Sequence, residues 1–280
     1  MEITADIVKQ LRDATGAGMM DCKKALVKAE GDFAQAEKIL KEMGLAAVAK
    51  RSGRATNNGS VFILIEKEKA VILELVCETD FVARNKDFIA LGNQLCKDVL
   101  VNGYTAVVPE LELKVKELIS TIKENMSLKR FQTIDIPANG FVSQYIHGEG
   151  SLGVMVLLTA GDPNVFASDR LKEFANDCAL HVAAFNPLFL SSNDVDAAYV
   201  KEQTEIFTAQ TLSLGKPEKV VPGIVQGKLS KHYSEVCLMQ QPFVKDDSQS
   251  VEKVLAAISK EVGTPVSIKQ FLFYKVGVEN

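Results

Sequence analysis

The stretch ELVCETDFVARN, residues 74–85, marks a change from strand to helix in the first half of the chain. The apolar run AVILELVC at 70–77 stops before Thr79 and Asp80, and an aromatic residue, Phe81, follows at once. One interpretation is a strand-to-helix corner in which Thr79 or Asp80 caps the helix and Phe81 turns into the core. The other is a charged group and an aromatic ring that face another molecule. The local pattern alone favours the corner, because aromatic side chains are usually buried.

The composition is typical of a soluble globular protein with more than one domain. The 280 residues are 47% hydrophobic and 24% charged, and a chain of this length lies near the size at which one core gives way to several. No apolar stretch approaches the roughly 20 residues that cross a bilayer, so we expect no membrane span. The opening residues, MEITADIVKQ, lack the apolar segment of a secretory signal. We therefore expect a cytoplasmic protein.

Cysteine spacing, histidine spacing and net charge argue against several classes of site. The five cysteines show no C-x-x-C spacing, and the three histidines are far apart, so neither a disulfide framework nor a metal cage is indicated. The net charge is −4 and no dense basic run is interleaved with aromatic residues, which argues against direct nucleic-acid binding. No serine or cysteine nucleophile arrangement occurs. We expect no metal, no cofactor and no catalytic residue.

The N-terminal segment predicts three short helices. Thr4 can cap the first helix, which the sequence TGAG at 15–18 interrupts. A second helix is expected to start near Met20, and Asp32 can cap a third. Gly44 is expected to close the third helix. The segment SGRATNNGS that follows has the composition of a linker.

The rest of the chain predicts two related α+β subdomains with antiparallel sheets. SVFILIE and AVILELVCE predict a β-hairpin, followed by helices at about 83–101 and 110–125 and a returning strand, SLKRFQTIDI. FVSQYIH and SLGVMVLLTA predict a second hairpin, followed by a helix at about 165–184. SVEKVLAAISKEV and VSIKQFLFYKV predict a final helix and a strand that completes the second sheet. Hairpin followed by helix therefore occurs twice.

Long helical segments at about 194–234, broken at Gly215 and Pro217, predict a protruding hairpin of two antiparallel helices. The predicted fold class is therefore α+β. The predicted domains are a three-helix domain over residues 1–52, a linker over 53–60, a core N-subdomain over 61–140, and a core C-subdomain over 141–280 that includes the helical arm.

The segment HGEGSLG at 147–153 has the G-x-G-x-x-G spacing of a dinucleotide-binding turn. Such a turn needs a helix immediately after it, whereas SLGVMVLLTA is typical of a strand, so a glycine-rich hairpin turn is favoured. His147 ends a strand beside this turn, where an exposed imidazole could serve a partner. His181, in the mostly apolar helical segment CALHVAAF, is expected to be a hydrogen-bonded core histidine.

Two methionines, Met19 and Met20, follow TGAG at a helix start. The local pattern favours methionines that fill the three-helix core, although paired methionines at a turn also suit an adaptable protein-binding surface. Lys23 beside them is expected to be a solvated charge.

Two longer motifs, TGAGMMDCKKAL at 15–26 and ETDFVARN at 78–85, resemble bacterial translation elongation factor Ts. The resemblance continues through YIHGEGSLGVMV, LHVAAFNPLFL, SLGKPEKVV and MQQPFVKD, and therefore covers almost the whole chain. It implies a guanine-nucleotide exchange factor for elongation factor Tu, the GTPase that delivers aminoacyl-tRNA to the ribosome. It also implies that the N-terminal domain is ubiquitin-associated-like and that the protein is not an enzyme in the covalent sense.

The resemblance also assigns the site residues. Family members use the sequence T-D-F-V as a wedge that disturbs the Mg²⁺ site of the partner, and these letters match Thr79, Asp80, Phe81 and Val82. Further partner-contact positions match Met19, Met20, Lys23 and His147. The helical arm serves dimerisation in some relatives, which makes a homodimer through the arm a further expectation. With the resemblance counted, the wedge becomes the favoured interpretation of Phe81.

Overall fold

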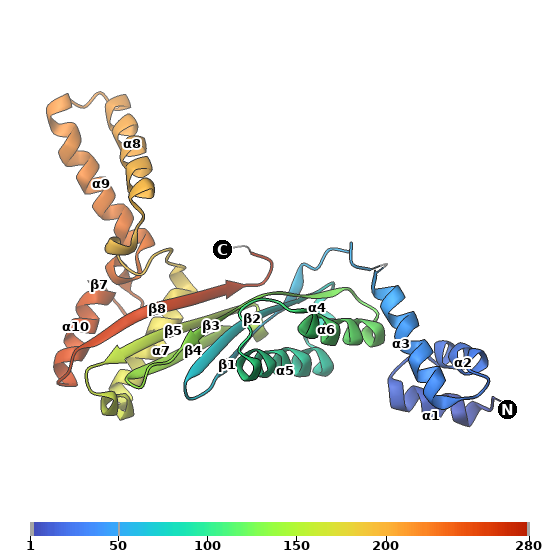
Figure 1. Cartoon of the computed structure of the whole chain (residues 1–280). Coiled ribbons are helices and arrows are strands. Elements are labelled where there is room, and N and C mark those ends of the chain that lie inside the picture. Colours follow the sequence, from blue (N-terminus) through green and yellow to red (C-terminus); the bar gives the residue numbers. More distant parts are fainter. Residues whose placement is uncertain (1–2, 50, 279–280) are drawn as a thin grey trace. The chain divides into compact units, whose positions relative to one another are not determined.

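The computed structural model describes residues 3–49 and 51–278, and Figure 1 shows their elements in chain order. The chain divides into two compact units. Unit 1 comprises Met1–Thr133, Ile146–Leu152 and Tyr274–Asn280, and unit 2 comprises Ile134–Tyr145 and Gly153–Phe273. Helices and small β-sheets make up the fold, which confirms the predicted α+β class. The predicted domain limits stay predictions, and the outermost two, residues 1 and 280, lie outside the described residues.

Three helices form the N-terminal part of unit 1, as predicted: α1 (Ala5–Thr15), α2 (Met19–Lys28) and α3 (Phe33–Ala49). The Thr4 hydroxyl accepts a hydrogen bond from the Ile7 amide, and Gly16, with φ 66°, ends α1 in the left-handed conformation. Asp32 accepts a hydrogen bond from the Gln35 amide at the start of α3. The buried side chains of the three helices form one cluster: Val8, Leu11, Cys22, Ala25, Leu26, Ala29, Ala36, Ile39 and Leu40.

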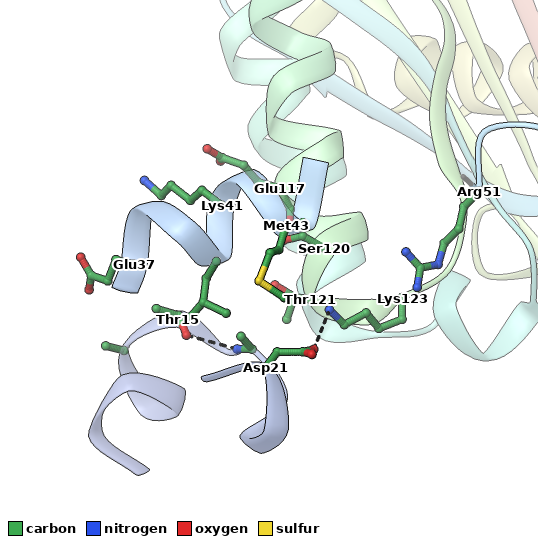
Figure 2. Close-up of a pocket in the computed structure, with 14 residues that line it drawn as sticks. Thr15, Asp21, Glu37, Lys41, Met43, Arg51, Glu117, Ser120, Thr121 and Lys123 are labelled. Atoms are coloured by element: carbon green, nitrogen blue, oxygen red, sulfur yellow. Dashed lines mark hydrogen bonds and ion pairs between the residues drawn. The ribbon is translucent and has the colours of Figure 1, made fainter. Parts of the chain in front are cut away.

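Helix α3 continues past Gly44, so the prediction that this glycine closes the helix is wrong. Gly44 lies where α3 approaches α6 (Pro109–Ile122), and a Cβ atom added to it would lie 2.7 Å from the Cβ atom of Ser120. The close approach of two helices, and not a left-handed turn, therefore requires the glycine. Residues of α3 and α6, among them Met43 and Ser120, line one pocket of unit 1 (Figure 2). Further along α3, Val48 joins the core of the first sheet, so α3 contributes to two cores.

The first sheet has the strand order β1-β2-β3, formed by β1 (Asn58–Ile65), β2 (Lys69–Cys77) and β3 (Met126–Asp135). Strands β1 and β2 pair antiparallel from Asn58↔Cys77 to Ile65↔Ala70, which confirms the predicted hairpin. Strand β1 begins inside the segment predicted as a linker. Glu74 of β2 is 1% exposed, and its carboxylate pairs with Arg130 of β3 at 2.7 Å. It also accepts a hydrogen bond from the Gly277 amide, so the buried charge is compensated.

Two consecutive helices follow β2 and pack on the first sheet. The helix expected at about 83–101 is α5 (Lys86–Asn102), and a separate one-turn helix, α4 (Asp80–Ala83), lies before it. The reason is a cap: the Asn85 side chain accepts a hydrogen bond from the Asp87 amide and starts α5 afresh. Helices α5 and α6 bury Phe88, Leu95 and Val115 in the core of this sheet.

The second sheet has the strand order β4-β5-β8, formed by β4 (Gly140–His147), β5 (Leu152–Ala160) and β8 (Val266–Lys275). This order confirms that the last strand completes the second sheet. A 3₁₀ turn, η1 (Gly148–Gly150), connects β4 to β5 as a hairpin. After β5 come η2 (Pro163–Ala167) and α7 (Asp169–Phe185), and α10 (Val251–Glu261) precedes β8. The helix predicted at 165–184 thus begins later, after the proline-initiated turn.

Unit 2 also contains the predicted pair of helices, α8 (Ala197–Ser213) and α9 (Val221–Val236), with η4 (Glu218–Val220) between them. They pack through Val221, Val225 and Leu229, with Phe207 and Tyr233 alongside. Sequence reasoning did not predict the short elements η3 (Ser192–Asp194), η5 (Leu238–Gln240), β6 (Pro242–Phe243) and β7 (Asp246–Ser250). Strands β6 and β7 pair antiparallel.

Candidate functional site

The turn that follows β2 sends Phe81 into solvent. Thr79 caps α4, because its hydroxyl accepts a hydrogen bond from the Val82 amide at 3.4 Å. Val82 is 7% exposed and joins the core of the first sheet, whereas Phe81 is 84% exposed. Successive helical residues point about 100° apart, so a turn that buries Val82 directs Phe81 away from the core. Thr79 is therefore the cap that one interpretation predicted, and the burial of Phe81 that the same interpretation predicted is wrong.

Hydrogen bonds to Thr79 hold this turn. Glu124, just after α6, accepts from the Thr79 amide at 3.1 Å and from the Thr79 hydroxyl at 2.8 Å. The Cys77 thiol donates to the Thr79 carbonyl oxygen at 3.1 Å. Burial and the nearby Glu124 charge raise the pKa of the Cys77 thiol to about 12. A thiol with that pKa stays protonated near neutral pH, so Cys77 is a structural donor and not a nucleophile.

An ion pair connects this turn to the tip of the second hairpin, within unit 1. The Nε atom of Arg84 lies 3.0 Å from Oε2 of Glu149, and the same guanidinium lies 3.9 Å from Asp80. Glu149 has a φ of 57°, in the left-handed region. The next residue, Gly150, is buried against Ser60 of β1, where an added Cβ would lie 2.9 Å from the serine Cβ. The structure therefore fixes the hairpin tip and the α4 turn on one side of unit 1.

His147 is exposed at the end of β4, beside this tip. The segment after HGEGSLG is strand β5, as predicted, so the glycines lie in a hairpin turn and no helix follows them directly (Figure 1). A dinucleotide turn requires that helix. The hollow beside the tip is lined in part by polar side chains of both charges, among them Asn57, Ser60, Asp80, Arg84, Glu149 and Lys275.

The predicted contact residues near the N-terminus face solvent on α2. Met19 is 44% exposed and Met20 is 65% exposed, so the alternative in which they fill the three-helix core is wrong. Cys22, Ala25 and Leu26 fill it instead. Lys23 is exposed, as expected.

Helix α2 and the end of α6 line the pocket in Figure 2. Asp21 and Lys123 approach to 3.9 Å there, which places the start of α2 beside the turn that carries Glu124. The other lining residues include charges of both signs, among them Glu37, Lys41 and Glu117.

Sequence reasoning missed three residues that build the site: Arg84, Glu124 and Glu149. The expected helix at 110–125 would have placed Glu124 in a last helical turn. The helix ends at Ile122 instead, because Lys123 adopts a φ of 71°. A signal existed only for Arg84, which lies in the motif ETDFVARN, and for Glu149, which lies in the stretch YIHGEGSLGVMV that extends the resemblance.

The buried histidine, His181, is a core residue, as predicted. Its Nδ1 atom accepts from the Val244 amide at 3.1 Å, so the proton is on Nε2, which donates to Gln241 Oε1 at 2.9 Å. Burial lowers the pKa of this imidazole. Within the described residues, no cluster of three or more histidine, cysteine or acidic side chains is arranged to hold a metal ion. In that same part of the chain, none of the helices combines the length and apolar character that crossing a bilayer requires.

Comparison with known proteins gives a consistent result over nearly the full length. The sequence model of the family described as Elongation factor TS matches residues 78–278. Elongation factor Ts of Treponema denticola is 48% identical over 278 residues, which cover 99% of each chain. Elongation factor Ts of Borrelia recurrentis is 46% identical over 278 residues, 99% of this chain and all of the relative. Elongation factor Ts of Treponema pallidum strain Nichols is 44% identical over 290 residues, with both chains covered completely. The chain therefore belongs to the elongation factor Ts family, a family of translation elongation factors.

Proposed function

We propose that this chain is a guanine-nucleotide exchange factor that binds elongation factor Tu, disturbs its Mg²⁺ and phosphate site, and promotes the release of GDP so that GTP can bind. The observation that carries the proposal is Phe81, an aromatic side chain 84% exposed on a short helix that buried neighbours hold in place. A large apolar ring held in water by an ordered turn costs free energy in the isolated protein, and contact with a partner recovers it.

The mechanism follows from linkage. A factor that binds the nucleotide-bound and the nucleotide-free partner equally well does not shift the equilibrium between these two states. The exposed surface must therefore fit the nucleotide-free state better. The Phe81 ring enters an apolar crevice that opens when the partner's nucleotide site is distorted, and the Asp80 carboxylate holds the displaced polar groups. Loss of Mg²⁺ coordination removes the cation that offsets the phosphate charge, and GDP leaves faster.

The size of the effect requires more than one contact surface. An acceleration of ~10⁴-fold lowers the barrier to release by about 5.5 kcal/mol, whereas one hot-spot side chain supplies roughly 2–4 kcal/mol. Met19, Met20 and Lys23 on α2, together with His147, are the proposed further contacts. Their exposure supports this assignment, since a residue must be accessible to contact a partner.

The same proposal excludes covalent catalysis and a bound cofactor. The glycine-rich segment leads into β5, and Cys77 and the other free cysteines are buried. Neither arrangement suits a nucleotide-dependent enzyme or a thiol nucleophile. Exchange by differential binding needs neither, because it makes and breaks no covalent bond.

The proposal extends to assembly and location. Among the exposed apolar side chains of the α8 and α9 segment are Leu212, Leu214 and Val220. They support a homodimer through this arm, since burial of exposed leucine and valine side chains against each other is favourable.

We place the protein in the cytoplasm, with no direct contact to nucleic acid or membrane. The domain limits proposed from the sequence apply: residues 1–52, 53–60, 61–140 and 141–280.

The test is the release of a fluorescent GDP from purified elongation factor Tu, followed by stopped flow with and without this protein. We expect release to accelerate with protein concentration until it saturates. A release rate that stays at its spontaneous value at micromolar protein would refute the function. Tight binding of NAD or ATP to this chain in the same preparation would favour an enzyme instead.

A further inference from the structure

Helix α4, which carries Phe81, is too short to be stable on its own. It spans four residues, Asp80–Ala83, and a helix of one turn is unstable in water because nucleation fixes several dihedral angles for one hydrogen bond. Its order must therefore come from tertiary contacts. The Val82 side chain supplies one, in the core of the first sheet. Thr79 supplies the others at the N-terminus of the helix.

Every polar backbone and side-chain group of Thr79 has a partner. Its amide and its hydroxyl both donate to the Glu124 carboxylate, and its carbonyl oxygen accepts from the Cys77 thiol. The hydroxyl oxygen also accepts from the Val82 amide and caps α4. Because the hydroxyl proton is committed to Glu124, the oxygen lone pairs are aimed at the helix. Glu124 therefore sets the orientation of the cap as well as its position.

The residues on both sides of Glu124 are anchored. Lys123, with φ 71°, ends α6 and donates its amide to the Ile119 carbonyl oxygen. The next residue, Asn125, is 8% exposed and donates its side-chain amide to the Arg54 carbonyl oxygen at 2.7 Å. Glu124 thus lies between two anchored residues. A carboxylate in this position can accept two hydrogen bonds at once without ordering a flexible chain.

We propose that Glu124 is a positioning residue for nucleotide exchange: its carboxylate fixes Thr79 and thereby the direction in which Phe81 faces the partner. The inference rests on the proposed function. Glu124 acts by preorganisation, since a wedge that already points in its bound direction loses less conformational freedom on binding. The residue itself need not touch the partner.

Glutamine tests the charge and the acceptor pattern at nearly constant volume. In Glu124→Gln the single amide oxygen can accept from only one of the two Thr79 donors: if it takes the hydroxyl, the NH₂ group opposes the Thr79 amide, and if it takes the amide, the hydroxyl proton loses its acceptor. We expect the second-order rate of GDP release to fall roughly 10-fold, the size expected when one charged hydrogen bond is lost. The matched control is Glu112→Gln on α6, which makes the same charge change at an exposed ion pair with Lys116. The control should stay within about twofold of the unsubstituted protein.

A double-mutant cycle with Phe81→Ala separates positioning from general support of the fold. If Glu124 acts through the wedge, Glu124→Gln should change release by less than about twofold once the Phe81 ring is gone. An equal loss in both backgrounds means that Glu124 only supports the structure, and it overturns the inference. Unchanged release in the single variant overturns it as well.

A stability measurement and a replacement variant keep the outcome unambiguous. Melting curves followed by circular dichroism give the folded fraction of each variant, and rates are expressed per folded molecule. If Glu124→Gln is unfolded at the assay temperature, Glu124→Asp replaces it in the cycle, because it keeps the charge but shortens the side chain that reaches Thr79. If the unsubstituted protein does not accelerate GDP release from elongation factor Tu, the proposed function is refuted. If it does accelerate release but the effects of Glu124→Gln and Phe81→Ala are additive, only the positioning role of Glu124 is refuted.

Discussion

Arg84 and Glu149 join the two segments that carry the candidate site, with 3.0 Å between Arg84 Nε and Glu149 Oε2. One residue follows α4 and the other lies at the tip of the β4–β5 hairpin. Their side chains are 67% and 74% exposed, so the ion pair contributes little to the free energy of unfolding. Its effect is instead to hold two exposed segments in one arrangement.

The first prediction concerns this pair. Arg84→Gln and Glu149→Gln should each leave the melting temperature within about 2 °C, since exposed ion pairs contribute at most about 1 kcal/mol. GDP release should slow roughly threefold, because the hairpin tip and the α4 turn lose their link. The charge-swapped double variant, Arg84→Glu with Glu149→Arg, should recover most of the rate. A double variant as slow as both single changes combined would mean that these charges act on the partner separately. Lys116→Gln on α6 is the control for loss of one exposed ion pair.

The second prediction separates an exposed wedge from a core aromatic residue. Phe81→Ala should leave the melting temperature almost unchanged and slow GDP release by a hot-spot amount, roughly 30- to 1,000-fold. Phe88→Ala is the matched control, since Phe88 is fully buried in the core of the first sheet. It should lower the free energy of unfolding by about 3–5 kcal/mol. Thermal unfolding and stopped-flow release on the same samples measure both effects. A fall of ten degrees or more in Phe81→Ala, with normal release per folded molecule, would contradict the wedge.

The sequence predicted the strands and most helices because their signals are local. The β-branched runs of β1, β2 and β5 and the caps Thr4 and Asp32 act through near neighbours. The direction of Phe81 is different. It depends on Val82 joining the core and on Glu124, a residue far along the chain, holding Thr79. No local pattern contains that information, and resemblance alone pointed to the ring.

Gly44 is a second residue whose role depends on a tertiary contact that the local sequence does not contain. A glycine inside a helical pattern is typical of a helix end, and locally that was the better interpretation. The residue that explains it, Ser120, belongs to α6, and their proximity exists only in the folded unit. Likewise Met19 and Met20 could not be assigned to core or surface until Cys22 and Leu26 were seen to fill the bundle.

The third prediction is a pH dependence of stability that originates at His181. Its Nδ1 atom accepts from the Val244 amide, so protonation would set two donors against each other, and burial already lowers its pKa. A folded-state pKa below the unfolded value near 6.5 means that the unfolded chain binds more protons. The stabilisation is therefore complete above about pH 6.5 and is lost as the pH falls below it, at up to about 1.4 kcal/mol per pH unit.

The measurement is the free energy of unfolding between pH 7.5 and 5.5. His181→Gln should be less stable at pH 7.5 and should show a shallower decline toward pH 5.5. Identical slopes in the His181 variant and the unsubstituted protein would assign the acid sensitivity to other groups.

The fourth prediction concerns the contact between α3 and α6. Gly44→Ala adds a Cβ atom 2.7 Å from the Ser120 Cβ, which forces the two helices apart and should lower the free energy of unfolding by about 1–3 kcal/mol. Gly227→Ala is the control, because Gly227 lies in α9 with nothing within 4 Å of an added Cβ. That change should stabilise the protein by up to about 1 kcal/mol, since alanine favours a helix more than glycine does. Circular dichroism during thermal unfolding measures both variants.

The double variant Gly44→Ala with Ser120→Gly completes this test. Removing the Ser120 side chain relieves the clash but places a glycine inside α6, which costs about 1 kcal/mol. The double variant should therefore be more stable than the sum of the two single effects predicts, by roughly 1 kcal/mol or more. Additive effects would mean that α3 does not pack against α6 at Gly44 in solution, and the glycine would then need another explanation.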